Sequence, residues 1–287
     1  MNEFGGSHTT AKLDVIQNYL EAYTTALSRQ GFKTVYFDAF AGSGKVQIGD
    51  KTGLFEGVAD IGAIIEGSAR RALQLKRPFD EYIFVEEIQK NVDHLLELQD
   101  EFPLLADRIK VRHSDANEEI SNFCSSTNWS KTRSVVFLDP FGNQVDWNSI
   151  KRIAKTKSID LWYLFPAGLG VNRLISKDGV ILPDHEKSLN RLLGERDWEK
   201  IWTVETSTPD FFDNNHTIRE KQANVDDITR FVIDLMKREF EGGVLNSWLP
   251  LGPNNAHWYS LLFAWSNPSQ KATTLAKKLG LAVMNRK

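Results

Sequence analysis

The chain has a single cysteine, Cys124, among its 287 residues. It therefore cannot form an internal disulfide, and no zinc or iron–sulfur site can be built from its cysteines. One cysteine is typical of a reducing compartment, so we expect a cytoplasmic protein. The histidines lack the spacing of metal ligands, and we expect no metal. These scattered histidines include His113, His185, His216 and His257.

Long apolar runs and an excess of one charge are also missing. No stretch reaches the roughly 18 to 20 apolar residues that span a bilayer, and the first residues lack the basic-then-apolar pattern of a signal peptide. We therefore expect no membrane partner. The net charge of −3 and the pI near 6.1 give no general attraction to nucleic acid, so binding to RNA or DNA would need a local basic patch.

The chain does contain an alternation of short apolar segments and amphipathic helices. Apolar residues at steps of three and four predict a helix from residue 8 to about residue 29. Five expected strands are Thr34–Ala39, Glu81–Val85, Ile109–Val111, Ser134–Leu138 and Ile159–Phe165. Because parallel neighbours need crossover helices, this alternation predicts an α/β fold with a doubly wound, mostly parallel, Rossmann-like sheet and helices on both faces.

Later segments divide the chain further. The helix that follows the second strand is expected to bury Val92, Leu95, Leu96 and Leu98. A helix from Val225 to Phe240, a strand from Trp258 to Trp265 and a helix from Lys271 to Leu279 are expected near the end. We predict a helical extension over residues 1–30, the Rossmann-like core over 31–166, an inserted helical lid without strands over 167–224, and elements that complete the sheet over 225–287.

Acidic residues follow several of the predicted strands at the point where each strand ends. Asp38, Glu86, Asp115 and Asp139 all occupy such positions. In an open α/β sheet, ligands bind outside the carboxyl ends of the strands. The glycines of the segment 41–44 let the backbone approach a ligand closely, and an acid after the second strand can accept hydrogen bonds from ribose hydroxyls. Each feature alone is common in turns, but together they suit an adenosine-bearing cofactor.

Two other nucleotide sites fit the sequence less well. The pair Gly44-Lys45 would need a glycine where Ala39 stands and a serine or threonine where Val46 stands to form a phosphate-binding P-loop. A dinucleotide-binding turn would need a third glycine at position 47, which is Gln47. Hydrolysis of a nucleoside triphosphate and dinucleotide binding are therefore both disfavoured.

Two motifs resemble those of known methyltransferases. The segment Phe37-Asp38-Ala39-Phe40-Ala41-Gly42-Ser43-Gly44 resembles motif I of the class I enzymes that use S-adenosylmethionine, and Val136-Phe137-Leu138-Asp139-Pro140-Phe141-Gly142 resembles their motif IV. With His8-Thr9, Lys12, Gly67-Ser68 and Asn172-Arg173, the layout over residues 8–270 resembles the three-Cys-motif partner protein family. Members of that family are methyltransferase-like proteins encoded beside a cysteine-motif protein.

The resemblance implies which residues bind the cofactor and which act on the acceptor. The implied S-adenosylmethionine site consists of Asp38, Phe40, Ala41, Gly42, Ser43, Gly44, Glu86, Asp115, Ala116 and Lys12. Glu86 is expected on the ribose hydroxyls and Asp115 near the adenine amine. The first turns of the leading helix, with His8, Thr9 or Lys12, are expected near the methionine end.

The implied catalytic residues are Asp139, Pro140 and Phe141. Amino-methyltransferases commonly carry a second proline where Phe141 stands, and Asp-Pro-Phe-Gly is closer to the tRNA guanine-N2 methyltransferases. Asp139 can accept a hydrogen bond from an exocyclic NH₂ group, and Phe141 can stack on a base. A plain strand cap followed by a proline turn is the alternative interpretation.

Three functions are compatible with these features. The leading hypothesis is methyl transfer from S-adenosylmethionine to an exocyclic amine of a nucleobase in RNA or DNA. The second is a cofactor-binding module that works with a cysteine-motif partner protein and has little catalysis of its own. The third is methylation of a protein or a small molecule, which the near-neutral charge permits.

Overall fold

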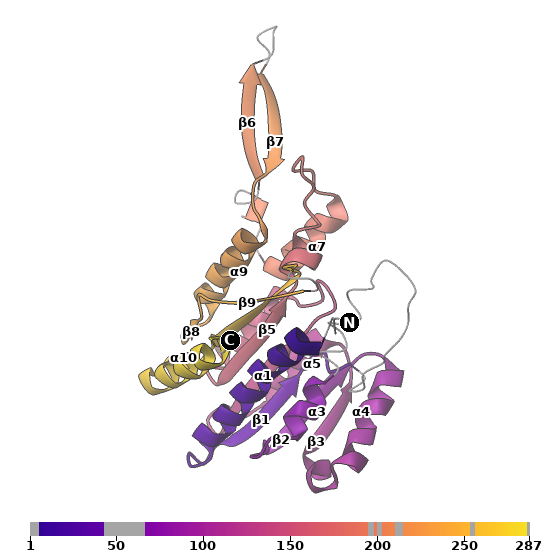
Figure 1. Ribbon diagram of the computed structural model, residues 1–287, viewed down its shortest axis with the longest axis vertical. Helices are drawn as coiled ribbons and strands as arrows, with labels where there is room; N and C mark the ends of the chain where they lie inside the picture. The colour runs from indigo at the N-terminus through magenta and orange to yellow at the C-terminus, as the bar shows by residue number, and fades with distance from the viewer. Residues whose placement is uncertain are drawn as a thin grey trace.

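The computed structural model describes residues 6–42, 67–194, 198–199, 203–209, 215–252 and 256–285, and for residues 6–13, 203–209 and 215–219 it describes the backbone alone. The fold is built on an eight-stranded sheet with the strand order β3-β2-β1-β4-β5-β10-β8, in which β9 also pairs with β10 (Figure 1). Its parallel strands are β1 (Lys33–Asp38), β2 (Glu81–Glu86), β3 (Ile109–His113), β4 (Thr132–Leu138) and β5 (Ile159–Phe165).

The remaining strands of this sheet come from the end of the chain. Strand β10 (Tyr259–Trp265) lies antiparallel to β5, and the short β8 (Gly243–Val244) and β9 (Leu249–Leu251) pair with β10. The order of the five parallel strands is that of a doubly wound, Rossmann-like sheet. The predicted fold class is therefore confirmed.

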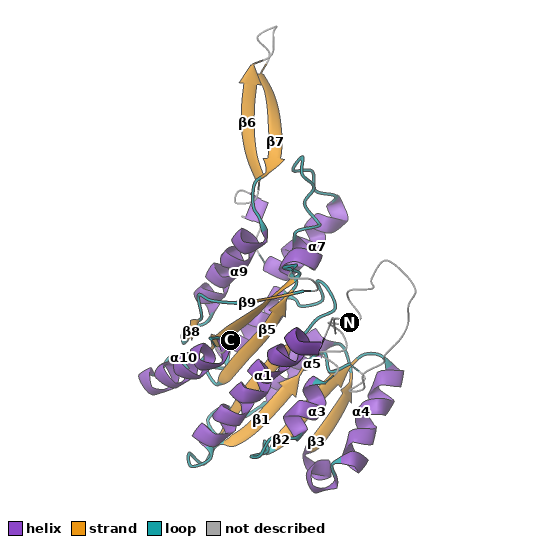
Figure 2. Cartoon of the chain, in the orientation of Figure 1, coloured by secondary structure: helices purple, strands orange, loops and turns teal. Residues whose placement is uncertain are grey.

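Helices cover both faces of the sheet (Figure 2). One face is covered by α1 (Gly6–Leu27), α3 (Ser68–Leu73), α4 (Gln89–Glu101) and α10 (Gln270–Met284). The opposite face is covered by α5 (Ala116–Ser126), α6 (Trp147–Lys155), α7 (Pro183–Leu193) and α9 (Val225–Glu239). A 3₁₀-helix, η1 (Pro103–Arg108), precedes β3, and a π-helical turn, η2 (Ala167–Val171), follows β5. Within the described ranges, no helix is both long enough and apolar enough to cross a membrane.

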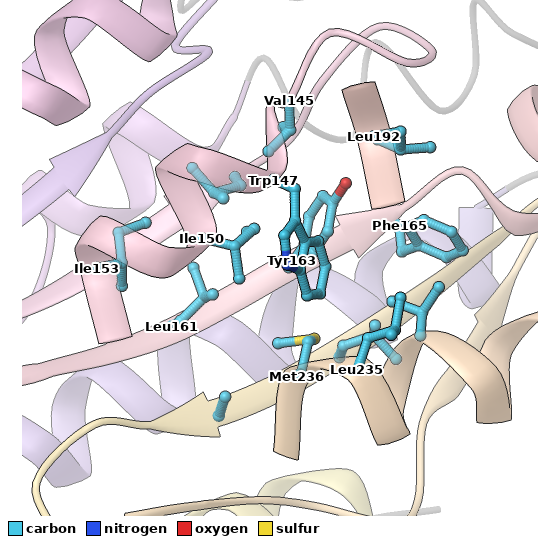
Figure 3. Packing of buried hydrophobic residues seen from close by; sticks show 14 of the residues in the cluster. Val145, Trp147, Ile150, Ile153, Leu161, Tyr163, Phe165, Leu192, Leu235 and Met236 are labelled. Atoms are coloured by element: carbon cyan, nitrogen blue, oxygen red, sulfur yellow. The ribbon is translucent and has the colours of Figure 1, made fainter. Parts of the chain in front are cut away.

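Side chains alternate between two apolar cores, one on each face of the sheet. Along β1, Val35 and Phe37 belong to the core under α5, α6 and α9, whereas Tyr36 belongs to the core under α1, α3 and α10. Figure 3 shows the first of these cores, where Trp147 from α6 lies with Tyr163 from β5 and Met236 from α9. The period of two places Asp38 on the same face as Tyr36, and so beneath α1 and α3.

The segment between β5 and α9 differs from the prediction of a lid without strands. Strands β6 (Thr203–Pro209) and β7 (Asn215–Lys221) form an antiparallel hairpin, which projects beyond α7 and α9 at the top of Figure 1. The prediction was wrong because these strands carry threonines and charged residues where buried strands carry apolar ones, so hydropathy gives little signal.

Leu96 in α4 is a second difference from the prediction. It was expected on the buried side of this helix, but it is 45% exposed, whereas Val92, Leu95 and Leu98 are buried. Successive helical residues lie about 100° apart around the axis, so a residue next to Leu95 points away from the centre of the buried stripe.

Candidate functional site

The carboxyl ends of the parallel strands bring together most of the predicted site residues. Residues Asp38 and Phe137 are partners in the ladder between β1 and β4, so Asp38 and Asp139 follow neighbouring strands at the same edge. Glu86 ends β2, which lies on the other side of β1. Because Tyr36, Phe84 and Phe137 share one core, the side chains two residues further on face the same side of the sheet.

Asp38 is fully buried, and neutral groups hold its carboxyl group. The Ser68 hydroxyl donates a hydrogen bond to Oδ2 at 2.7 Å, the backbone N–H of Phe40 donates to Oδ1 at 3.3 Å, and the Tyr36 hydroxyl lies 3.4 Å from Oδ2. Burial raises the pKa of Asp38 to about 6, and these hydrogen bonds oppose the rise. The Asp38 carboxylate is therefore an oriented charge near neutral pH.

The turn after β1 crosses the edge of the sheet close to two other strands. The N–H of Ala39 donates to the carbonyl of Phe137 at 3.1 Å, and the N–H of Ala41 donates to the carbonyl of Val85 at 3.0 Å. Gly42 has a φ of 61°, in the left-handed region that favours glycine. Phe40 is half-buried and Ala41 is buried, while Ser43 and Gly44 lie outside the described residues. The turn is thus tied to β4 and β2 by backbone hydrogen bonds beside Asp38.

Asp139 is buried and has no partner among the described residues. It is 8% exposed, and its carboxyl group makes no hydrogen bond or ion pair with any residue that the structure describes. Burial and then the negative charge of Asp38 raise the pKa of Asp139 well above its usual range. An unpaired carboxyl in such a place is costly, so a protonated carboxyl or a bound ligand is the state that the site favours.

The residues after Asp139 form a turn that Gln144 holds by a hydrogen bond. Pro140 is buried, whereas the ring of Phe141 is 69% exposed. The N–H of Phe141 donates to Gln144 Oε1 at 2.8 Å, and Gly142 has a φ of 75°. The turn therefore holds an open aromatic face close to a buried carboxyl.

One carboxylate oxygen of Glu86 and one of Asp115 accept hydrogen bonds from nearby backbone N–H groups. Glu86 Oε1 accepts from the N–H groups of Glu87 at 3.0 Å and Ile88 at 2.8 Å. Asp115 is exposed and caps α5, because its Oδ1 accepts from the N–H of Glu118 at 2.9 Å; Ala116 behind it is buried. These bonds orient both carboxylates, and no described residue donates a hydrogen bond to their second oxygens. The roles predicted for Glu86 and Asp115 stay predictions.

The direction of α1 bears on the prediction for Lys12. The Asp14 carboxylate pairs with Arg71 Nη1 at 2.7 Å, which ties α1 to α3, the helix that begins at Ser68. The turns before Asp14 therefore extend toward the carboxyl edge of the sheet. The Lys12 side chain lies outside the described part of the chain, and its role stays a prediction.

Sequence patterns missed three side chains at this edge. Tyr36 and Ser68 contact Asp38, and Tyr259 at the start of β10 lies close enough to Asp139 for its charge to act on the phenol. Burial raises the pKa of Tyr259 to about 12, the Asp139 charge adds to the rise, and Arg173 opposes it. No local signal identifies Tyr259, because strand pairing alone brings β10 beside β5.

No family model matches the sequence, and no curated protein matches it. Among solved structures, the chain is similar to protein LPL1258 from Legionella pneumophila, with 13% identity, a TM-score of 0.47, and coverage of 94% of this chain and 91% of that chain. It is also similar to a methyltransferase from Geobacter sulfurreducens, with 13% identity, a TM-score of 0.30, and coverage of 78% and 91% of the two chains.

Proposed function

We propose that this protein is a methyltransferase that binds S-adenosylmethionine and methylates an exocyclic amine on a planar acceptor, a nucleobase of RNA or DNA. One observation carries the proposal. A buried carboxyl that none of the described residues pairs with, Asp139, stands two residues before an exposed aromatic ring, Phe141, at the strand edge that also holds the Asp38–Gly42 turn.

The charge at this edge distinguishes between cofactors. Asp38 and Asp139 are buried at adjacent strand ends, and neither takes part in the ion pairs formed by the described residues. Phosphate groups would be repelled here, whereas a cation would offset the cost of burying these carboxyls. S-adenosylmethionine carries a positively charged sulfonium and no phosphate, so its chemistry fits this part of the site.

The other residues at the edge fit an adenosine moiety. Gly42 has no side chain, so a ligand can approach its backbone closely, and the Glu86 carboxylate is oriented by two backbone N–H groups. Such a carboxylate can accept hydrogen bonds from ribose hydroxyls. We assign Asp38 and Gly42 to the methionine side, Glu86 to the ribose, and the second oxygen of Asp115 to the adenine amine.

Asp139 and Phe141 would handle the acceptor. When bound, the cofactor supplies a methyl group whose bond to sulfur breaks, with the electron pair left on sulfur, as a bond to the acceptor nitrogen forms. Asp139 would orient the NH₂ group by accepting a hydrogen bond and would take the proton that the nitrogen gives up. Phe141 would hold the base by stacking on it.

A second candidate function is favoured by the β6–β7 hairpin. The two strands pair with each other and project from the body of the protein (Figure 1). An isolated two-stranded hairpin is marginally stable in water, which favours an interaction surface. In this alternative, the chain is a cofactor-binding partner of a cysteine-motif protein.

Methyl-transfer assays distinguish the two candidates. The protein would be incubated with cofactor radiolabelled on its methyl group and, separately, with total RNA, with DNA or with the product of the neighbouring gene. Label in a nucleic acid, recovered as an N-methyl base after digestion, is the result expected. If the protein binds the cofactor and captures the cysteine-motif protein, but no polymer is labelled, the partner-module function is favoured over the enzyme.

Replacing Glu86 with alanine tests the cofactor site. We expect a loss of about 1 to 3 kcal/mol in S-adenosylmethionine binding, because a hydrogen bond to a charged group is removed. Isothermal titration calorimetry measures the change. Glu81→Ala, at the opposite end of β2, is the matched control and should bind as the wild type does. Equal affinities of the Glu86 variant and the wild type would refute this assignment.

Replacing Phe141 with alanine tests the acceptor site. Because the ring is 69% exposed, the free energy of unfolding should hardly change. Acceptor binding should weaken by about 1 to 3 kcal/mol if a base stacks on the ring, while cofactor affinity stays constant. The measurement is KM for the methylated polymer found in the screen. Phe141→Tyr keeps the stacking face and should restore binding; equal KM values for all three proteins would exclude stacking.

A further inference from the structure

Two carboxyl groups share one buried environment at the carboxyl edge of the sheet. Asp38 follows Phe37 at the end of β1, and Asp139 follows Leu138 at the end of β4, the neighbouring strand. The side chain of Asp38 is fully buried, and that of Asp139 is 8% exposed. Two like charges in such a place repel each other, so the pair favours holding a single negative charge.

The described groups that face this pair do not compensate a second charge. Among the described residues, the donors to Asp38 are the hydroxyls of Ser68 and Tyr36 and the N–H of Phe40, all of them neutral. Glu86 on β2 adds a negative charge that acts on Asp38. On the side of Asp139, Tyr259 from β10 is a neutral phenol, and Arg173 acts on that phenol. Among the described residues, no cation pairs with either carboxyl.

The two carboxyls differ in which of them keeps the proton. Asp38 accepts the hydrogen bonds described above, which favour its charged form, whereas Asp139 has no donor among the described residues. The pKa of Asp139 is raised well above its usual range by burial and by the charge of Asp38. Of the two carboxyls, Asp139 therefore holds its proton more readily than Asp38 does.

We propose that a positively charged ligand in this site displaces the proton from Asp139. The protein then releases a proton when it binds S-adenosylmethionine, the sulfonium form of the cofactor. It releases none when it binds S-adenosylhomocysteine, the neutral thioether form. This inference rests on the proposed function and extends it to the regulation of the same site. A protonated Asp139 cannot accept a proton from the acceptor amine. The carboxyl becomes a base only when the methyl donor is present, and the site favours the methyl donor over the demethylated product.

The number of protons released on ligand binding can be measured, because proton release makes the affinity depend on pH. A ligand that releases one proton binds about tenfold more tightly for each unit by which the pH rises, within the range between the two pKa values of the linked group. S-adenosylmethionine and S-adenosylhomocysteine share their adenosine and amino-acid parts. The difference between their proton release therefore isolates the effect of the sulfonium charge.

The test is calorimetric titration of the full chain with each of these two ligands at pH 7, in several buffers that differ in ionisation enthalpy. The slope of the observed enthalpy against the buffer enthalpy gives the number of protons released. We expect close to one proton for S-adenosylmethionine and close to none for S-adenosylhomocysteine. In Asp139→Asn, release with S-adenosylmethionine should vanish while its affinity falls about tenfold or less.

Asp107→Asn is the matched control, because this exposed carboxyl lies in η1, before the start of β3 and away from the site. It should release protons as the wild type does, and circular dichroism would verify that both variants are folded. Equal proton release for the two ligands in the wild type would overturn the inference and leave the proposed function in place. Failure of both ligands to bind would overturn the proposed function and the inference with it.

Discussion

Replacing Asp139 with alanine should lower the rate of methyl transfer about 10²- to 10⁴-fold, the loss typical of a missing acid–base group. Asp139 is buried at the edge of the sheet and carries no structural hydrogen bond to the described residues, so few native interactions are lost with it. Asp38 remains as the counter-charge of the cofactor. Cofactor affinity at pH 7 should therefore fall about tenfold or less, and kcat should carry most of the effect.

The measurement is the initial rate with radiolabelled cofactor on the polymer identified by the screen, together with cofactor binding by calorimetry. Asp107→Ala is the control for removal of a carboxyl group, and its rate should equal that of the wild type. Asp139→Asn should also be slow, because an amide can orient the amine but cannot take its proton. A rate in Asp139→Ala within a few-fold of the wild type would show that motif IV does not act on the acceptor.

Replacing Asp160 with asparagine should stabilise the protein at high pH. This carboxyl lies near the start of β5, where the Tyr19 hydroxyl donates to its Oδ2 at 2.6 Å. Burial raises the pKa of Asp160 to about 7, although Tyr19 and Arg133 oppose the rise. Between about pH 4 and pH 7 the folded protein keeps a proton that the unfolded chain has lost, so wild-type stability decreases as the pH rises through this range.

Asparagine has no proton to lose and can still accept the bond from Tyr19. As the pH rises from 5 to 8, the free energy of unfolding of the variant should therefore increase by about 1 to 3 kcal/mol relative to that of the wild type. This energy range allows for partial solvation of the carboxyl group. Urea unfolding of both proteins at pH 5, 6, 7 and 8 measures this. Asp107→Asn should show no such trend, and a pH-independent difference between Asp160→Asn and the wild type would contradict the burial argument.

Much of the fold could be predicted from short stretches of sequence. The segment 159–165 was expected as a strand and forms one with the same bounds, because its apolar run needs only neighbouring residues to be recognised. The N-terminal helix and the helix from residue 225 were likewise found within two residues of their predicted ends. The β6–β7 hairpin escaped prediction because its stability comes from backbone pairing between two polar strands.

In the candidate site, too, some features could be predicted from the sequence and others depended on packing. Asp38, Glu86 and Asp139 could be predicted because each directly follows an apolar strand, and parallel strands end at one edge. Leu96 was wrongly assigned to the buried side of its helix, because it lies about 100° around the axis from Leu95, away from the centre of the buried stripe. Whether Asp115 caps a helix, and which groups bond to Asp38, likewise depended on packing.

The sequence by itself determined the alternation of strands and helices, the glycine turn after β1 and the acids at the strand ends, because hydropathy and turn preferences act over a few residues. Only the tertiary structure decided that β10 enters the sheet antiparallel beside β5 and that Tyr259 lies within the electrostatic reach of Asp139. It also decided that Asp139 is buried beside the charge of Asp38. The physical reason is that burial and electrostatic interaction depend on distances in space, which chain segments remote in sequence create together.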